Sequence, residues 1–280
     1  AIDDTLRRAY ACSTLSDDLT VIDLTDRTLV GKMPLDGSPL YAVADPLDGT
    51  VYASRQAGKS IAVIDGTFLT ETLTIETTGS PAGLALDVSR RQLVVAQTIT
   101  SAGKVTVIST DSGSTLMARS LDGAPYGLAS DPVSGKTYIS NTEGHTVTVL
   151  DAGGELGGIS LGHPIQQLVY NPTTGHLFAL SAAARLAYVI DAAKGETLLV
   201  LPVGRGAQYG IALDPRSNRV YITNSDDSTM TVIQDVPEEH ALHLPLILKD
   251  SRTVPMGRIN QRAIRETTPE EQASRRLGHR

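Results

Sequence analysis

Apolar and polar residues alternate along short segments of this chain, and the stretch from Pro125 to His163 shows the pattern most clearly. Its third segment reads Thr-Val-Thr-Val-Leu, which puts hydroxyls on one face and aliphatic side chains on the other, as a half-buried strand requires. Turn residues separate the segments, with Asp131-Pro132 after the first and Ser134-Gly135 before the second. The pattern predicts one small antiparallel sheet with strands at 126–130, 136–140, 146–151 and 155–161.

The same unit recurs along the chain. Copies begin at Leu40, Ala82, Gln166 and Tyr209, and an incomplete copy opens at Ala1. The aromatic or aliphatic position of the second strand falls at Tyr10, Tyr52, Val94, Tyr138, Phe178 and Tyr221, and the valine of the third strand at Val21, Val63, Val107, Val149, Val189 and Val232. The steps of 40 to 44 residues match a propeller blade, and helical periodicity is absent. Because one such sheet cannot bury its faces alone, the repeat predicts an all-β fold, a β-propeller of four-stranded antiparallel blades with six blades visible.

The repeat also sets the expected boundaries of the domains. We expect a propeller over 1–249, followed by a short polar tail over 250–280, with blades at about 1–38, 39–80, 81–124, 125–163, 164–207 and 208–249. The last outer strand is expected at 240–248, because Leu244-Pro245 follows Val232 at the spacing that separates Leu201-Pro202 from Val189. Residues 1–3 overlay residues 212–214, so the chain opens inside a first strand. We therefore expect further sequence upstream with about one more blade, the alternative being a terminus exposed by signal cleavage.

Charge divides the chain into an acidic body and a basic tail. Residues 251–280 hold seven Arg and three Glu, a formal charge of +4. Since the net charge of the whole chain is −7, the rest of the chain carries −11. An acidic body argues against nucleic acid as its main partner, and a disordered tail, or a short helix from Thr268, is the simplest interpretation of the basic terminus. No segment approaches the roughly 20 apolar residues of a membrane span. The single Cys12 matches Thr223 of the last copy and is expected to be a small core or semi-buried residue rather than a nucleophile.

The repeat motif resembles that of a known family. Pro-x-Gly-Leu-Ala-x-Asp-Pro, then Tyr-Ile-Thr/Ser-Asn, then Val-Thr-Val-Ile/Leu-Asp is similar to the YVTN-type β-propeller repeats, and 219–224 comes close to the motif that names them. The resemblance covers about 1–248 and implies a bacterial or archaeal secreted, periplasmic or surface-layer protein, hence an extracytoplasmic location, usually with seven blades. Three copies depart from the motif, at 52–55, 94–97 and 178–181.

Signatures of other propellers and of catalytic sites are missing from the sequence. The chain has no Trp, which the quinone-binding, WD40 and sialidase propellers need in their signatures. His240 and His243 are near neighbours but fall on opposite faces of a strand, so a shared metal is not expected. Asp17-Asp18 and Asp226-Asp227 occupy matching loops without the dense oxygen spacing of a calcium site. We therefore expect no catalytic residue, no bound metal and no cofactor.

The centre of the ring remains as a candidate site. In propellers the first strand of each blade is innermost, and the loop leading into it opens on the central channel, where ligands usually bind. Tyrosine rings can stack on a sugar, peptide or small polar ligand, and glutamine amides can hydrogen-bond to it. The simpler and preferred interpretation is that these side chains only fill the channel. The candidate ligand-binding residues are Tyr41, Tyr126, Gln166, Gln167, Tyr209 and Arg205.

Three functions fit a propeller of this kind. A non-catalytic, monomeric module that binds an unknown protein, peptide or small polar ligand is the leading hypothesis, because no catalytic constellation is visible. A lactonase-like hydrolase is the first alternative, since six-phosphogluconolactonase-type propellers resemble these repeats. It would need acids, His or Arg at the channel, and only Arg205 and His163 lie near suitable loops. The second alternative is a redox subunit like the propellers of methylamine dehydrogenase or haem d1 nitrite reductase, which would require channel-facing His ligands or a covalent cofactor partner.

Overall fold

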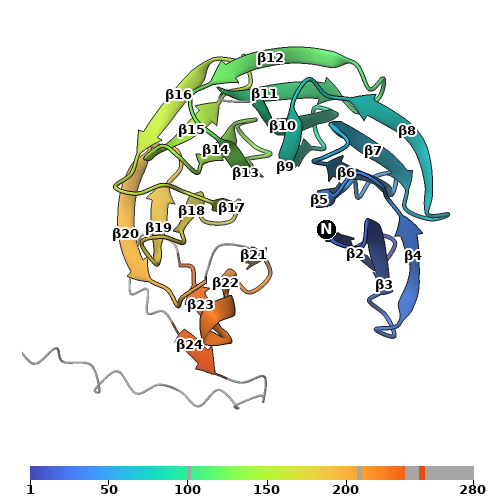
Figure 1. Ribbon diagram of the computed structural model, residues 1–280. Helices are drawn as coiled ribbons and strands as arrows, with labels where there is room; N and C mark the ends of the chain where they lie inside the picture. The colour runs from blue at the N-terminus through green and yellow to red at the C-terminus, as the bar shows by residue number, and fades with distance from the viewer. Residues whose placement is uncertain (100–101, 207–209, 237–245, 250–280) are drawn as a thin grey trace, which may run out of the picture. The chain divides into compact units, whose positions relative to one another are not determined.

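Six antiparallel sheets of four strands follow one another along the chain, and together they form a β-propeller (Figure 1). The structure, a computed structural model, describes residues 1–99, 102–206, 210–236 and 246–249, and residues 1–249 form one compact unit. The predicted all-β fold with six four-stranded blades is confirmed. In the described part of the chain, no helix is long and apolar enough to cross a membrane.

The strands run in sequence order through each blade, from the innermost to the outermost. Blades 1 to 3 comprise β1 (Ile2–Asp3), β2 (Arg8–Ser13), β3 (Asp18–Asp23), β4 (Leu29–Pro34), β5 (Pro39–Ala44), β6 (Thr50–Arg55), β7 (Ser60–Asp65), β8 (Thr70–Glu76), β9 (Ser80–Asp87), β10 (Gln92–Ile99), β11 (Ala102–Ser109) and β12 (Thr115–Leu121). Blades 4 to 6 comprise β13 (Pro125–Ser130), β14 (Thr137–Asn141), β15 (Thr146–Leu150), β16 (Leu156–Ser160), β17 (Gln167–Asn171), β18 (His176–Ser181), β19 (Leu186–Asp191), β20 (Glu196–Pro202), β21 (Ile211–Asp214), β22 (Arg219–Asn224), the short 3-10 helix η1 (Ser225–Asp227), β23 (Thr229–Gln234) and β24 (Leu246–Lys249).

The two repeating apolar positions of the sequence lie opposite each other in every blade. Each second-strand residue pairs with the third-strand valine of its own copy: Tyr10 with Val21, Tyr52 with Val63, Val94 with Val107, Tyr138 with Val149, Phe178 with Val189, and Tyr221 with Val232. The overlay of residues 1–3 on 212–214 is also confirmed, because Asp3 pairs with Arg8 as Asp214 pairs with Arg219. The sequence period is therefore the register of the middle strand pair.

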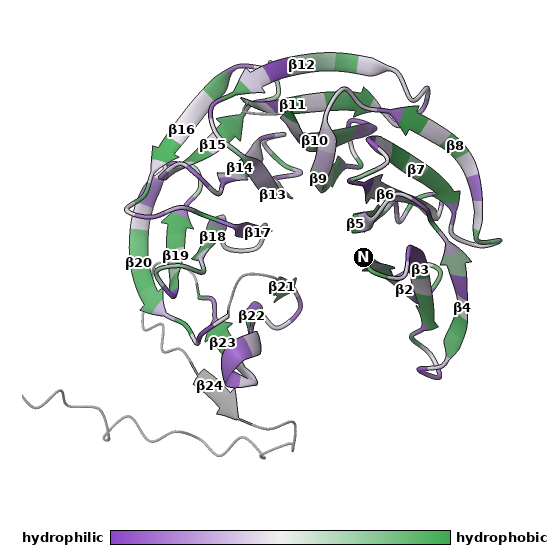
Figure 2. Cartoon of the chain, viewed as in Figure 1, coloured by the Kyte–Doolittle hydropathy of each residue, from purple (hydrophilic) through white to green (hydrophobic). Residues whose placement is uncertain are grey.

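Each blade buries its faces against its neighbours. Five hydrophobic clusters each combine residues of two successive blades, as where Tyr10 and Val21 of blade 1 pack with Val51 and Ile64 of blade 2. The inner strands follow the same order, since β5 contacts β9, β9 contacts β13, β13 contacts β17, and β17 contacts β21. Figure 2 shows hydrophobic segments recurring in the strands of the blades. The core is thus a series of layers between sheets, as the repeat requires.

Buried polar contacts also join neighbouring blades. The hydroxyl of Tyr10 donates to the carbonyl of Gly66 in blade 2, and that of Tyr138 donates to the carbonyl of Ala192 in blade 5, both at 3.2 Å. Arg91 of blade 3 forms an ion pair with the fully buried Asp45 of blade 2. Each contact reaches from one blade to a turn of a neighbouring blade, so the turns help to fix the angle between blades.

The outer strand of the last blade differs from its expected register. In blade 5 the first residue of β19 pairs with Pro202, whereas in blade 6 the first residue of β23 pairs with Lys249. Lys249 therefore occupies the place that the sequence spacing assigns to Pro245, four residues earlier. The connection that leads into β24 is longer than the turn between β19 and β20, so spacing from the preceding strand does not fix the register. Residues 240–245 of the expected strand lie outside the described residues.

Cys12 is half-buried in β2, and burial raises the pKa of its thiol to about 11. Because only the thiolate is nucleophilic, about a thousandth of the native thiol is reactive at pH 8, so we expect modification by a disulfide reagent to be more than tenfold slower than in unfolded chain. Absorbance of the released thiol chromophore measures the rate without ambiguity, because this is the chain's one cysteine. The control is the same reaction in guanidinium chloride, and equal rates in the two states would contradict the expectation.

Candidate functional site

Three of the predicted channel residues meet where the inner strands begin. Gln167 of β17 donates a hydrogen bond from Nε2 to the hydroxyl of Tyr41 in β5. The ring of Tyr41 meets the ring of Tyr126 in β13 edge to face, with centroids 5.8 Å apart and planes at 80°. Blades 2, 4 and 5 therefore contribute to one group, which we call the central cluster: Tyr41, Tyr126 and Gln167.

In two of these blades, irregular pairing at the start of the inner strand redirects side chains toward the centre. The register of β5 against β6, and of β13 against β14, shifts near the start of the inner strand. A bulge of this kind leaves backbone groups without ladder partners and redirects side chains. The hydroxyl of Ser54 accepts from the N–H of Tyr41 at 3.0 Å, and that of Ser140 accepts from the N–H of Gly127 at 2.7 Å. These serines are not among the residues predicted from the sequence, although both occupy the third position of the Tyr-Ala-Ser or Tyr-Ile-Ser motif.

One position of the inner strand carries a side chain in two blades and glycine in three others. In each blade, the aromatic or aliphatic position of the second strand pairs with a residue of the inner strand, and the position in question lies two residues before that partner. We call it the centre slot. It holds Tyr41, Gly83, Gly127, Gln167 and Gly210. A Cβ on Gly83 would lie 2.1 Å from the carbonyl oxygen of Tyr126, and one on Gly127 would lie 2.8 Å from that of Gln166. Blades 3 and 4 therefore tolerate no side chain at the centre slot. In blades 2 and 5 the slot holds Tyr41 and Gln167, which bond to each other.

The central cluster is largely desolvated and uncharged. Burial raises the pKa of Tyr41 well above its usual range, and the smaller effect of the hydrogen bond from Gln167 acts in the opposite direction. The tyrosine hydroxyl therefore stays protonated at physiological pH and can both accept and donate hydrogen bonds. Gln167 is buried, while Tyr126 is partly accessible. Such a group offers stacking and neutral hydrogen bonding.

Two of the remaining channel candidates are placed elsewhere. Gln166 turns back into its own blade, where its Oε1 accepts from the N–H of Ala182 at 2.7 Å. Arg205 is exposed and bound to Asp227, which accepts from both its Nε and its backbone N–H at 2.7 Å. Tyr209 lies outside the described residues.

Potential ligands for metals or for lactone chemistry are also dispersed. Nδ1 of His163 bonds the hydroxyl of Tyr188 in β19. Within the described ranges, no three His, Cys, Asp or Glu side chains come close enough together to hold a metal ion. Asp17 instead accepts from the N–H of Ser38 at 2.7 Å, in the link between blades 1 and 2. Asp17 and Asp227 thus occupy matching loops and both bind the backbone of a link between blades.

Comparison with known proteins finds relatives of the sequence and of the fold. No family model matches the chain. Two proteins named "Uncharacterized protein YncE", from Salmonella typhi and from Salmonella typhimurium strain LT2, are each 29% identical to it over 238 residues. These alignments cover 78% of this chain and 65% of the relatives' length.

Among solved structures, the hydrazine synthase of Kuenenia stuttgartiensis superposes with a TM-score of 0.72 at 17% identity. The superposition covers 83% of this chain and 75% of the hydrazine synthase chain. Identity this low shows the fold alone. The chain is thus similar in sequence to the YncE proteins of Salmonella, and it has the fold of a β-propeller with six four-stranded blades.

Proposed function

We propose that this chain is a non-catalytic propeller of the YVTN repeat type that acts, as a monomer, as an extracytoplasmic binding or protein-interaction module. The observation that carries the proposal is the central cluster, in which Tyr41, Tyr126 and Gln167 converge from three blades. The repeat motif and the similarity to the YncE proteins support the repeat type. The extracytoplasmic location rests on the resemblance of the repeat motif alone.

The chemistry of the central cluster indicates the kind of ligand. The accessible part of the Tyr126 ring can stack on an apolar face of a ligand, and the tyrosine hydroxyl and glutamine amide can pair with its polar groups. Since the cluster is uncharged, an uncharged peptide or small polar molecule fits it better than an ion does. The competing interpretation, in which the side chains only fill the channel, predicts no ligand at this place.

A thermal-shift screen separates these interpretations. A ligand that binds only the native state stabilises it by mass action and thereby raises Tm. At a ligand concentration of 100 times Kd, the free energy of unfolding increases by about 2.7 kcal/mol. The panel consists of uncharged dipeptides, simple lactones and monosaccharides. We expect at least one compound to raise Tm of the parent chain, and this shift to disappear in Tyr126→Ala.

The control is Tyr170→Ala, which removes a half-buried tyrosine that stacks on Tyr138 at 5.9 Å and lies outside the central cluster. Its Tm without ligand should fall, but the ligand-induced shift should remain. A panel without any shift, or one in which every shift survives Tyr126→Ala, would contradict the proposal. If the chain hydrolysed a lactone and Tyr41→Phe abolished this activity, the chain would be a hydrolase and not a non-catalytic module.

A further inference from the structure

The second blade carries a charged residue at a position where the other blades carry a neutral polar one. Three residues after the aromatic position, blades 3 and 4 carry Gln97 and Asn141, whose side-chain oxygens accept from backbone N–H groups in the link to their blade. The distances are 3.2 Å to the nitrogen of Gly79 and 3.2 Å to that of Ala124. Blade 2 has Arg55 at this position. A guanidinium carries donors only, so Arg55 cannot make the contact that Gln97 and Asn141 make.

Arg55 forms a charge pair that other blades cannot form. Its side chain reaches across the blade to Glu71 of the outer strand β8, and the pair forms an ion pair. Glu71 pairs with Ile64 in the sheet. The matching positions of blades 1, 3 and 5 hold neutral residues, namely Leu29, Thr115 and Thr197. The hydroxyl of Thr74 donates to the second oxygen of Glu71 at 2.5 Å. The pair is therefore built from two departures from the repeat that occur in the same blade.

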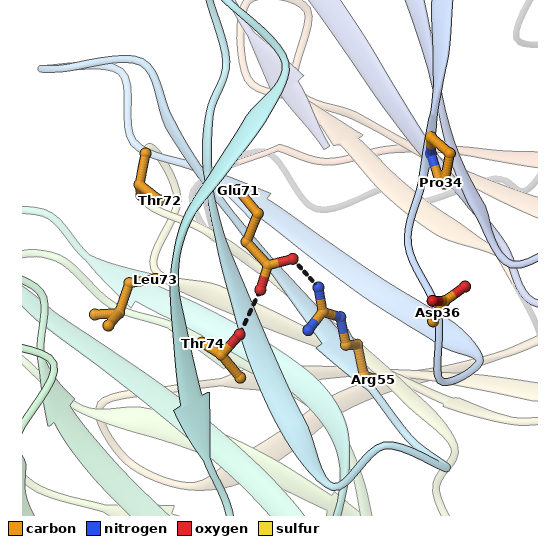
Figure 3. A pocket seen from close by; sticks show the side chains of 7 residues that line it. All are labelled: Pro34, Asp36, Arg55, Glu71, Thr72, Leu73 and Thr74. Atoms are coloured by element: carbon orange, nitrogen blue, oxygen red, sulfur yellow. Dashed lines mark hydrogen bonds and ion pairs between the residues drawn. The ribbon is translucent and has the colours of Figure 1, made fainter.

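A groove opens beside this pair, between the end of β4 and the outer strand β8 (Figure 3). Its volume of about 490 Å³ falls in the range of roughly 300–1,000 Å³ typical of small-molecule sites. The Arg55 side chain is only 13% exposed, and its Nε is buried with no hydrogen-bond partner among the residues that the structure describes. This Nε is out of reach of solvent and hence of a ligand, so the part of the Arg55 side chain that can meet a ligand is its remaining exposed surface.

We propose that this groove, the Arg55–Glu71 groove, binds a neutral polyhydroxylated ligand, that is, a carbohydrate. Glu71 and Asp36 supply carboxylate acceptors and Arg55 supplies donors. The hydroxyls of Thr72 and Thr74 donate to the carbonyl of Val63 and to Glu71, so each is left with lone pairs that can accept from a ligand. Neighbouring hydroxyl groups of a sugar both donate and accept, so they match acceptors and donors that lie side by side. Pro34 and the half-exposed Leu73 add apolar surface for the C–H face of a sugar ring.

The charges of the groove disfavour the other small ligands. Two carboxylates face one guanidinium that is already paired, so a phosphate or carboxylate ligand would meet net repulsion from Asp36 and Glu71. An amine would meet the positive charge of Arg55 and compete with it for Glu71. The site lies at an outer strand, whereas the central cluster lies at the inner strands, so this proposal stands apart from the proposed function of the channel.

The test uses the whole chain and saturation-transfer NMR with maltose, cellobiose, lactose and N,N′-diacetylchitobiose, followed by titration of any saccharide that binds. Arg55→Asn gives blade 2 the residue of blades 4 and 6, so the variant should fold, and Glu71→Gln keeps the shape of the acid. Since each variant removes a charge-assisted hydrogen bond to the ligand, we expect Kd to rise about tenfold or more in both. The matched control Lys194→Gln removes an exposed cation, paired with Asp191 in blade 5, and should leave Kd unchanged.

Several results would overturn the proposal. They are the absence of binding by all four saccharides at millimolar concentration, a Kd that neither groove variant changes, and binding that Tyr126→Ala abolishes while Arg55→Asn does not. Inorganic phosphate and N-acetyl-lysine amide serve as charged probes. Displacement of the saccharide by either of them at equal or lower concentration would show that the groove prefers an ion. Failure of the thermal-shift screen at the central cluster leaves this test unaffected, because the two sets of variants share no residue.

Discussion

Gly83→Ala is expected to lower the free energy of unfolding by about 3 kcal/mol, at the upper end of what overpacking costs. The added Cβ would lie 2.1 Å from the carbonyl oxygen of Tyr126 and 2.7 Å from Cδ1 of Leu128. The first contact is with backbone of the neighbouring inner strand, which cannot turn away as a side chain can. Relief requires β9 and β13 to separate where Tyr126 joins the central cluster. The midpoint of urea unfolding at unchanged m-value measures the loss.

Gly31→Ala is the matched control for this substitution. Gly31 lies in the outer strand β4, where an added Cβ would meet nothing within 4 Å. We expect a change within about 0.5 kcal/mol, of either sign, because the substitution also reduces the entropy of the unfolded chain. If the two variants unfolded at the same urea concentration, close approach of the inner strands would not be the reason for glycine at the centre slot.

Asp235→Ala is expected to cost about 3–5 kcal/mol, the range for breaking a buried, hydrogen-bonded ionic group by removing one partner. Asp235 follows β23 of blade 6 and is 1% exposed. Its carboxylate accepts from Nδ2 of Asn171 at 2.6 Å and from the hydroxyl of Thr174, and it lies 2.8 Å from Nδ1 of His176. These three side chains belong to blade 5. The substitution therefore removes the carboxylate that they share at the contact between blades 5 and 6.

Hydrogen exchange should show where the loss of Asp235 acts. Amides of β22 and β23 should exchange faster in the variant, while those of β6 and β7 in blade 2 should keep their protection. Asp111→Ala is the control, because Asp111 is 66% exposed and its partner Arg91 keeps Asp45 and Asp48. Equal destabilisation by the two substitutions, or a uniform loss of protection, would show that Asp235 does not hold blade 6 to blade 5.

The sequence predicts the fold well because the spacing between successive copies of the repeat determines how the middle strands pair. The aromatic position and the valine position lie directly opposite each other in the middle strands, so a constant spacing in sequence becomes a constant register. The prediction failed where spacing loses this meaning. The connection into β24 is longer than its counterparts, and the outer strand pairs four residues later than Pro245 would require.

The candidate site was only partly predictable, for a geometric reason. Gln166 and Gln167 are neighbours, and which of them faces the centre depends on strand alternation. The copies themselves hold a usable signal, since the centre slot is glycine in three of them and the exceptions, Tyr41 and Gln167, are the residues that bond. The pairing of Arg205 with Asp227 depends on two loops 22 residues apart and leaves no mark in the repeat.

Arg55 shows how drift within a repeat can be informative. Compared with the motif alone, Tyr-Ala-Ser-Arg at 52–55 is an ordinary departure. Only the register of the blade shows that Glu71, two strands away, departs from the repeat as well and forms an ion pair with Arg55. Paired departures in one copy are therefore a better guide to a site than single ones.

The bond between Gln167 and Tyr41 has a consequence for how the chain assembles during synthesis. Strands within a blade close short loops, whereas this bond joins residues 126 positions apart. The entropy cost of closing a loop rises with its length, so pairings inside each blade can form well before this one. On the ribosome, where the N-terminal part emerges first, Tyr41 waits until four blades have been made before its partner appears. The centre of the propeller is therefore among the last parts of the nascent chain to become ordered.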